Sequence, residues 1–258
     1  NPSAVLKTGI ADLSDQQSIR DYAQGFLATG ETIDVLINNA GVMVCPFGKT
    51  ADGIEMQFGT NHIGHFLLTN LLMPAILAGA NPRIVNLSSA GHTHSDVNLD
   101  DPNFEKSEYN AWESYGRSKS ANIHFTQEIV RRYGDRIQSF AVHPGVIMTE
   151  LGRHLTPELM NEMSERVKSR ATSSSEAKET GALPFKSVEA GAATQVWASV
   201  TEDLSENNGA YLGDCQVGVE GGNPSESGYL PYIFNRDTAE ALWSLSEKLV
   251  KQEFPHLT

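Results

Sequence analysis

Short apolar runs that end in small or polar residues recur along this chain of 258 residues. The clearest runs cover residues 33–41, 82–91 and 136–145, and weaker ones cover 3–14 and 209–218. Continuous apolar runs of this length are typical of parallel strands that are covered on both faces. The pattern therefore predicts a mostly parallel sheet, with small and polar residues gathered where the strands end.

Between these runs lie longer segments in which apolar residues recur at helical spacing. The first, 14–30, opens on a Ser/Asp cap signal and closes on Gly30, and the second, 52–80, is expected to bend near Pro74. The remaining predicted helices are 111–134, 187–204 and 237–254. Strands that alternate with helices predict an α/β fold, a doubly wound parallel sheet of Rossmann-like type, in one domain spanning 1–258.

The composition limits the partners that the chain can have. Its net charge is −13, and 40% of its residues are apolar. Because it has no basic stripe that would displace counterions from phosphates, we expect neither a nucleic-acid partner nor binding to an anionic membrane surface. The most apolar segment, 65–80, is interrupted by Thr69, Asn70 and Pro74 and is too short to span a bilayer. We expect a buried helix there and no membrane segment in this chain.

Two cysteines, Cys45 and Cys215, are too few and too far apart for a disulfide framework or a zinc site. Each is expected to be a small buried side chain, which fits a reducing compartment and a cytoplasmic location. His143 is interpreted as a packed strand residue rather than a base or a ligand, so no metal site is predicted. The sequence contains neither an H-E-x-x-H pattern nor a G-x-S-x-G elbow, which argues against a zinc hydrolase and a serine hydrolase.

Tyr115 and Lys119 stand four residues apart in the 111–134 segment and project from one face of a helix. An ammonium group stabilises a nearby phenolate, so Lys119 is expected to lower the pKa of Tyr115 and make proton exchange feasible. Ser89, at the end of its strand, offers a hydroxyl that could hold a substrate oxygen. The alternative is a surface Tyr and Lys, with Ser88 and Ser89 as turn residues.

Five motifs occur in one order and at compatible spacing: NNAG (38–41), TNHIG (60–64), IVNLSSAG (84–91), YGRSK (115–119) and HPGVIMT (143–149). Together they resemble the short-chain dehydrogenase/reductases. The later segments GAATQVWASV, GAYLGDC and ALWSLSEKLV are similar to the retinol-dehydrogenase and WW-domain-oxidoreductase-like branch. The resemblance implies an NAD(P)-dependent oxidoreductase that moves a hydride between nicotinamide and a carbonyl or alcohol substrate. The branch suggests a hydrophobic substrate and slightly favours NADP.

The resemblance also implies roles for single residues. Tyr115 would be the catalytic acid/base, Lys119 its partner and a donor to the ribose hydroxyls, Ser89 the holder of the substrate oxygen, and Asn61 the holder of a relay water. The implied cofactor-binding residues are Asp12, Leu13, Asn39, Ala40, Gly41, Tyr115, Lys119, Pro144, Gly145, Ile147 and Thr149. Without the resemblance, Asp12 is a helix cap, Asn61 bonds to backbone, and the NNAG and HPG segments are ordinary turns.

The sequence departs from the family in one respect. It contains no glycine-rich turn that would receive the pyrophosphate, and it begins where the family's third strand would begin. We expect the first two strands of the family's sheet to be absent, which would expose an apolar sheet edge. Either the chain is a fragment of a longer enzyme, which we favour and which would have little activity alone, or it exists as given. A binding or regulatory protein that keeps the fold without turnover is the alternative function.

Two segments are expected to wall the substrate cleft. Segment 92–113 matches an extended loop of the retinol-dehydrogenase-like branch, and 146–186 resembles the family's substrate lid; a surface loop and an amphipathic helix are the alternatives. Within the second, 172–181 is low in complexity and predicts a mobile polar loop. The resemblance also allows a homo-oligomer that pairs through the helices at 52–80 and 111–134.

Overall fold

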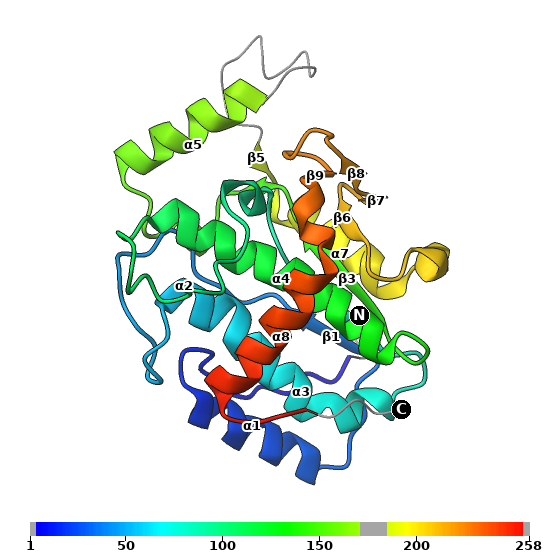
Figure 1. Ribbon diagram of the computed structural model, residues 1–258. Helices are drawn as coiled ribbons and strands as arrows, with labels where there is room; N and C mark the ends of the chain where they lie inside the picture. The colour runs from blue at the N-terminus through cyan, green and yellow to red at the C-terminus, as the bar shows by residue number, and fades with distance from the viewer. Residues whose placement is uncertain (1–3, 171–184, 255–258) are drawn as a thin grey trace.

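A five-stranded sheet forms the centre of the fold (Figure 1). The computed structural model describes residues 4–170 and 185–254, so the loop expected at 172–181 lies outside the described residues. The sheet order is β1-β2-β3-β6-β7, and its strands are β1 (Val35–Asn38), β2 (Arg83–Leu87), β3 (Gln138–His143), β6 (Tyr211–Gly213) and β7 (Gln216–Val217). Adjacent strands from β1 to β6 are parallel, which confirms the predicted sheet. The 209–218 run, however, forms an antiparallel hairpin of β6 and β7 rather than one strand.

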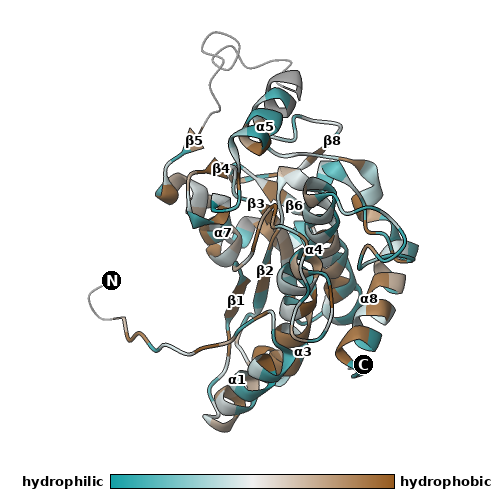
Figure 2. Ribbon diagram, turned by 90° about the vertical axis from the view of Figure 1, so that its left-hand side faces the viewer, coloured by the Kyte–Doolittle hydropathy of each residue, from teal (hydrophilic) through white to brown (hydrophobic). Residues whose placement is uncertain are grey.

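Helices cover both faces of this sheet. Figure 2 shows α7 on one side and α4 with α8 on the other, which confirms the doubly wound α/β fold. The helices are α1 (Gln16–Ala28), α2 (Met56–Phe58), α3 (Gly64–Leu77), α4 (Ala111–Tyr133), α5 (Pro157–Arg170), α7 (Val188–Val200) and α8 (Arg236–Val250). Short 3-10 helices cover Ala90–His94, Glu150–Gly152, Glu202–Asn207 and Pro231–Phe234. Two small parallel pairs complete the fold, β4 (Val146–Ile147) with β5 (Phe185–Lys186) and β8 (Val219–Glu220) with β9 (Gly228–Tyr229).

The segment 52–80 is not one helix. Glu55 starts the first helix at Met56, because its carboxylate accepts hydrogen bonds from two backbone N–H groups at 3.0 and 2.8 Å. A π-helical turn, Gly59–Ile63, then separates α2 from α3. The irregularity therefore lies at this turn rather than near Pro74, which stands inside α3. Across the described residues, no helix is both long enough and apolar enough to cross a bilayer.

The weak apolar run at 3–14 does not form a strand, so this prediction is wrong. Val5, Leu6 and Ile10 are 84–89% exposed, and residues 4–12 have no regular structure. A strand needs a neighbour to pair its backbone groups, and β1 is the edge strand of the sheet as described. The side chains of β1 at Val35 and Ile37 are 38% and 39% exposed, as expected for an uncovered apolar edge.

Helix α8 lies across α3 and α4 (Figure 1). Its Trp243 ring packs 4.9 Å from that of Phe66 and 5.9 Å from that of Phe125, and Ser246 bonds His62 at 2.9 Å. In all, 17 of the 23 residues of α4 and 10 of the 14 residues of α3 are buried. The pairing of two copies through these helices stays a prediction, because the structure contains a single chain.

The two cysteines differ. Cys45 is buried, as expected, but Cys215 is exposed. It lies in the tight turn between β6 and β7, at the end of the sheet, with a φ of 53°.

Candidate active site

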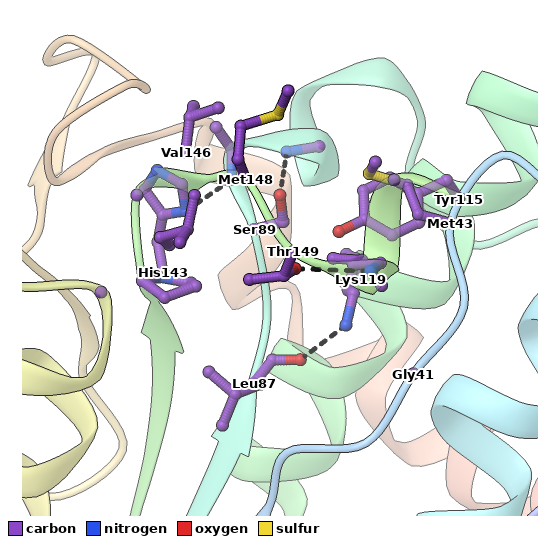
Figure 3. A pocket seen from close by; sticks show the side chains of 18 of the residues that line it. Gly41, Met43, Leu87, Ser89, Tyr115, Lys119, His143, Val146, Met148 and Thr149 are labelled. Carbon is purple, nitrogen blue, oxygen red and sulfur yellow. Dashed lines mark hydrogen bonds between the residues drawn. The ribbon is translucent and has the colours of Figure 1, made fainter. Parts of the chain in front are cut away.

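The carboxyl ends of β1, β2 and β3 meet at a cavity of about 720 Å³. The NNAG, SSAG and HPG segments all contribute to its lining, as the sequence predicted for the polar ends of parallel strands. Figure 3 shows Ser89, Tyr115 and Lys119 around this cavity. They come from two elements, since Ser89 follows β2 while Tyr115 and Lys119 lie on α4.

The two adjacent serines have different roles in the structure. Ser88 is buried, and its hydroxyl donates to the backbone carbonyl of Lys119 at 2.9 Å, which ties β2 to α4. Ser89 is partly exposed and lines the cavity beside Tyr115. Its oxygen also accepts from the Gly91 backbone N–H at 3.0 Å. This geometry favours Ser89, the residue chosen from the sequence, as the one that meets a substrate.

Lys119 and Tyr115 do share one face of α4. The Lys119 ammonium lies 5.6 Å from the centroid of the Tyr115 ring and donates to the Leu87 carbonyl at 3.1 Å (Figure 3). Burial lowers the pKa of Lys119 to about 8, because the surrounding protein solvates the charged ammonium poorly. At neutral pH the group is still mostly cationic.

The expectation that Lys119 lowers the pKa of Tyr115 is wrong for this arrangement. Burial dominates and raises the pKa of Tyr115 to about 12, and the hydrogen bond from Ser89 opposes it only in part. The ring is 4% exposed, so a phenolate would lose most of its hydration. The structure thus holds Tyr115 as a neutral phenol, which is the form that can donate a proton.

Asn61 lies in the π-helical turn beside these residues. Its side-chain oxygen accepts from Val42 N–H at 2.8 Å, and its amide donates to the Val42 carbonyl and to the Ser118 hydroxyl, each at 2.9 Å. Gly41 packs so closely that a Cβ there would lie 3.0 Å from the Asn61 oxygen. The side chain is therefore used to fix the backbone after the NNAG segment, which matches the alternative reading of Asn61.

Most of the predicted cofactor-binding residues line the cavity. These are Asn39, Ala40, Gly41, Tyr115, Lys119, Pro144, Gly145, Ile147 and Thr149. Asp12 and Leu13 are not part of its described lining. Asp12 accepts from the Ser14 hydroxyl and N–H at 2.7 and 2.9 Å, hydrogen bonds that lower the pKa of its carboxyl, and Leu13 packs against Gly64. Asp12 does not cap α1 either, since Asp15 does.

Sequence reasoning missed several residues of the cavity. Gly91, His94 and Trp112 come from the 92–113 region and its flank, and none of them stands in a pattern that indicates chemistry. The 146–186 segment adds Met148, Leu151, Leu155, Met160, Met163 and Phe185, while Met43 follows the NNAG motif. Both segments expected to wall a substrate cleft therefore reach the cavity, and their contributions are largely apolar.

Residues 5–159 match the sequence profile of the short chain dehydrogenase family, which is more than half of the chain. The chain belongs to the short-chain dehydrogenase family. Human retinol dehydrogenase 14 is 39% identical over 93% of this chain and 65% of its own length. The short-chain dehydrogenase/reductase prx1 of Penicillium roqueforti is also 39% identical, over 93% of this chain and 68% of its own length.

A solved structure shares the fold. The crystal structure of an uncharacterized protein from Mycobacterium paratuberculosis shares 31% identity, with a TM-score of 0.67 over 95% of this chain and 75% of that chain. The 258-residue chain spans about two thirds of the length of human retinol dehydrogenase 14 and of prx1. The retinol-dehydrogenase-like branch indicated by the later sequence segments is confirmed by these relatives.

Proposed function

We propose that this protein is an NAD(P)-dependent oxidoreductase that acts on a hydrophobic carbonyl or alcohol. The observation that carries the proposal is the placement of Ser89, Tyr115 and Lys119 around one cavity at the carboxyl ends of the strands. A nicotinamide cofactor supplies the hydride when it is bound. The branch resemblance favours NADP over NAD.

In this proposal the chain's own residues handle the substrate oxygen and its proton. The Ser89 hydroxyl holds the oxygen, and Tyr115 gives it a proton during carbonyl reduction. The high pKa of Tyr115, about 12, suits that direction because the phenol is protonated at every physiological pH. Lys119 places a positive charge near the phenol and stabilises negative charge that develops there.

The residues at the cavity also fit a nicotinamide nucleotide. Gly41 and Gly145 have no side chain to obstruct a flat ligand, and a Cβ on Gly145, at a φ of 89°, would lie 2.7 Å from Lys186. Lys119 donates to a single described acceptor, so an ammonium with three donors keeps capacity for ribose hydroxyls. Asn39, Ala40, Pro144, Ile147 and Thr149 would complete the contacts. Asp12 and Leu13 remain proposed for the adenine end.

The apolar wall supports a hydrophobic substrate. Four methionines, Met43, Met148, Met160 and Met163, line the cavity together with Trp112. Methionine side chains adapt to irregular apolar ligands and make favourable contacts with them. Curated relatives of this chain are named retinol dehydrogenases, so retinaldehyde is a suitable probe.

The test is oxidation of NADPH or NADH by the full-length protein with retinaldehyde as the probe, compared with Tyr115→Phe. The variant keeps the ring but lacks the hydroxyl that gives the proton, so kcat should fall by about 100-fold or more while the circular dichroism spectrum stays the same. Equal turnover by the two proteins would show that Tyr115 is not the proton donor. Tight NADPH binding without any turnover would favour the binding or regulatory alternative.

A further inference from the structure

One peptide group at the site is held on both sides by buried histidine side chains. This is the peptide that joins Ser89 to Ala90. Its carbonyl oxygen lies 2.7 Å from Nδ1 of His92, and its N–H donates to Nδ1 of His143 at 3.2 Å. The two histidine side chains are 0% and 2% exposed. Neither contact was visible in the sequence, where both histidines lie near motif residues without a chemical role.

The two rings are in opposite tautomers. A carbonyl oxygen only accepts, so Nδ1 of His92 carries the proton, and its Nε2 accepts from Leu230 N–H at 3.4 Å. Nδ1 of His143 accepts an N–H, so its proton is on Nε2. None of the described residues forms a hydrogen bond of full geometry with Nε2 of His143. The backbone of Ser225 lies near this ring. Both imidazoles are thus neutral, one as donor and one as acceptor.

The topology explains why the rings meet there. Strands β2 and β3 are parallel neighbours with Leu87 opposite Val142, and Ser88 N–H still bonds the Val142 carbonyl at 2.8 Å. Ser89 and His143 therefore leave the sheet side by side. His92 reaches back from the short helix that follows Ser89, and its ring packs 5.2 Å from that of Tyr211.

The surroundings keep His143 neutral. Burial is the main cause that lowers the pKa of His143 to about 4, and the positive charge of Lys186 acts in the same direction, as a proton on His92 would. Asp214 opposes them, but Lys186 itself is ion-paired with Asp214. If His143 were protonated, its Nδ1 would carry a proton and could not accept from the Ala90 N–H. That hydrogen bond would be lost, and the two N–H groups would repel each other.

The consequence falls on Ser89. Rotation of the Ser89–Ala90 peptide would turn the backbone that follows Ser89 and so displace the Gly91 N–H, which donates to the Ser89 hydroxyl oxygen at 3.0 Å. With the peptide fixed, the Ser89 oxygen also accepts from Gly91 N–H, so its own proton points away from that N–H group. A hydroxyl held in this way is ready to meet a substrate oxygen without reorganisation.

We propose that His92 and His143 are positioning residues, which clamp the Ser89–Ala90 peptide between a donor and an acceptor and so hold the Ser89 hydroxyl in its working orientation. The proposal deepens the proposed function and rests on it for the role of Ser89. Its structural part, the clamp itself, can be measured without turnover.

The experiment compares apolar with amide replacements in the full-length protein. In His143→Asn and His92→Asn the side-chain amide reaches the position of Nδ1 and can accept or donate as required, whereas His143→Leu and His92→Leu cannot. Hydrogen exchange of the Ala90 amide should be slow in the native protein and in His143→Asn, and faster by about 10-fold or more in His143→Leu, in line with one lost hydrogen bond. Imidazole nitrogen shifts should report neutral rings of opposite tautomer between pH 6 and 8.

Turnover of retinaldehyde with NADPH supplies the functional readout. Each Leu variant should lower kcat by about 100-fold at nearly unchanged KM, because the substrate still enters the apolar cavity but meets a misplaced hydroxyl. Each Asn variant should recover kcat to within about 10-fold of the native protein. His124→Leu is the control, since His124 is an equally buried histidine of α4 that bonds Asp96 at 2.8 Å, and its loss should leave kcat unchanged.

The outcomes separate the two proposals. Suppose that turnover depends on Tyr115 but that the Leu variants keep the native kcat and the slow hydrogen exchange of the Ala90 amide. This result would overturn the clamp and leave the proposed function standing. A protein whose turnover is indifferent to Tyr115→Phe would overturn the proposed function, and Ala90 exchange and the imidazole shifts would still decide whether the clamp exists. Two histidines in the same tautomer, or a charged one, would also overturn it.

Discussion

Gly91 lies directly against the ring of Tyr115, and a Cβ on Gly91 would stand 2.6 Å from Cε1 and 2.8 Å from Cδ1 of that ring. The same Cβ would stand 3.3 Å from the Ser89 hydroxyl oxygen. Its φ is not in the left-handed region, so the need for glycine here is one of space. The proposed proton donor is therefore positioned by the absence of a side chain in the loop opposite.

Gly91→Ala should displace the Tyr115 ring and reduce turnover with little change in the fold. A shift of the ring by about 1 Å is enough to lower kcat by about 100-fold. Gly25→Ala is the matched control, because Gly25 lies within α1 and none of the described residues comes within 4 Å of a Cβ there. That control should leave kcat unchanged and raise the free energy of unfolding by about 0.5–1 kcal/mol. Native kcat in Gly91→Ala would contradict the prediction.

The adjacent serines should separate stability from turnover. Ser88→Ala removes a buried hydrogen bond to the Lys119 carbonyl and should lower the free energy of unfolding by about 1 kcal/mol, with a modest effect on kcat. Ser89→Ala should lower kcat by about 100- to 1000-fold and change the stability little. Chemical denaturation and steady-state kinetics on both variants check this. The reverse pattern would mean that the catalytic serine had been misassigned.

Lys119→Met should abolish turnover while it stabilises the fold. The ammonium of Lys119 holds its proton up to pH 10.5 when unfolded but only to about 8 in the folded chain. Between these values the unfolded state binds more protons, so the stability of the native protein rises with pH across that window. The gain from Lys119→Met should be about 1–3 kcal/mol at pH 7 and shrink toward pH 10. A variant that is less stable at pH 7 would contradict this prediction.

Trp243→Ala should be among the most destabilising single changes. The indole is 2% exposed, packs on Phe66 and Phe125, and lies 4.0 Å under the Arg132 guanidinium. Its loss leaves a cavity between α8 and the helices below and should cost about 3–5 kcal/mol. Val200→Ala, at a position of α7 that is 70% exposed, should cost less than about 0.5 kcal/mol. Thermal unfolding of both variants is the measurement, and equal midpoints would refute the assignment of α8 to the core.

The sequence predicted the strands and helices that depend only on the pattern of apolar residues within a short segment. The apolar runs that became β1, β2 and β3, and the helical spacing of α4, were each readable within one short window. Polar residues at the ends of parallel strands must meet at one edge, so the positions of Asn39, Ser89 and Pro144 at a common cavity followed as well.

The rest depends on contacts between segments that are distant in sequence. Whether 3–14 becomes a strand is decided by the neighbour available to it, not by its own apolar residues. Likewise the pKa of Tyr115 is set by how completely the folded chain buries the phenol. Spacing along α4 placed Lys119 correctly but contained no information on that burial, so the direction of the pKa change was predicted wrongly.

The packing of α8 also bears on how this protein is made. During synthesis α3 and α4 leave the ribosome before α8, so Phe66 and Phe125 emerge without the Trp243 ring that later covers them. At an elongation rate of about 5–20 residues per second, roughly a hundred residues must still be translated, which leaves that apolar surface open for several seconds. A nascent chain of this kind is a natural client for holding chaperones until its final helix arrives.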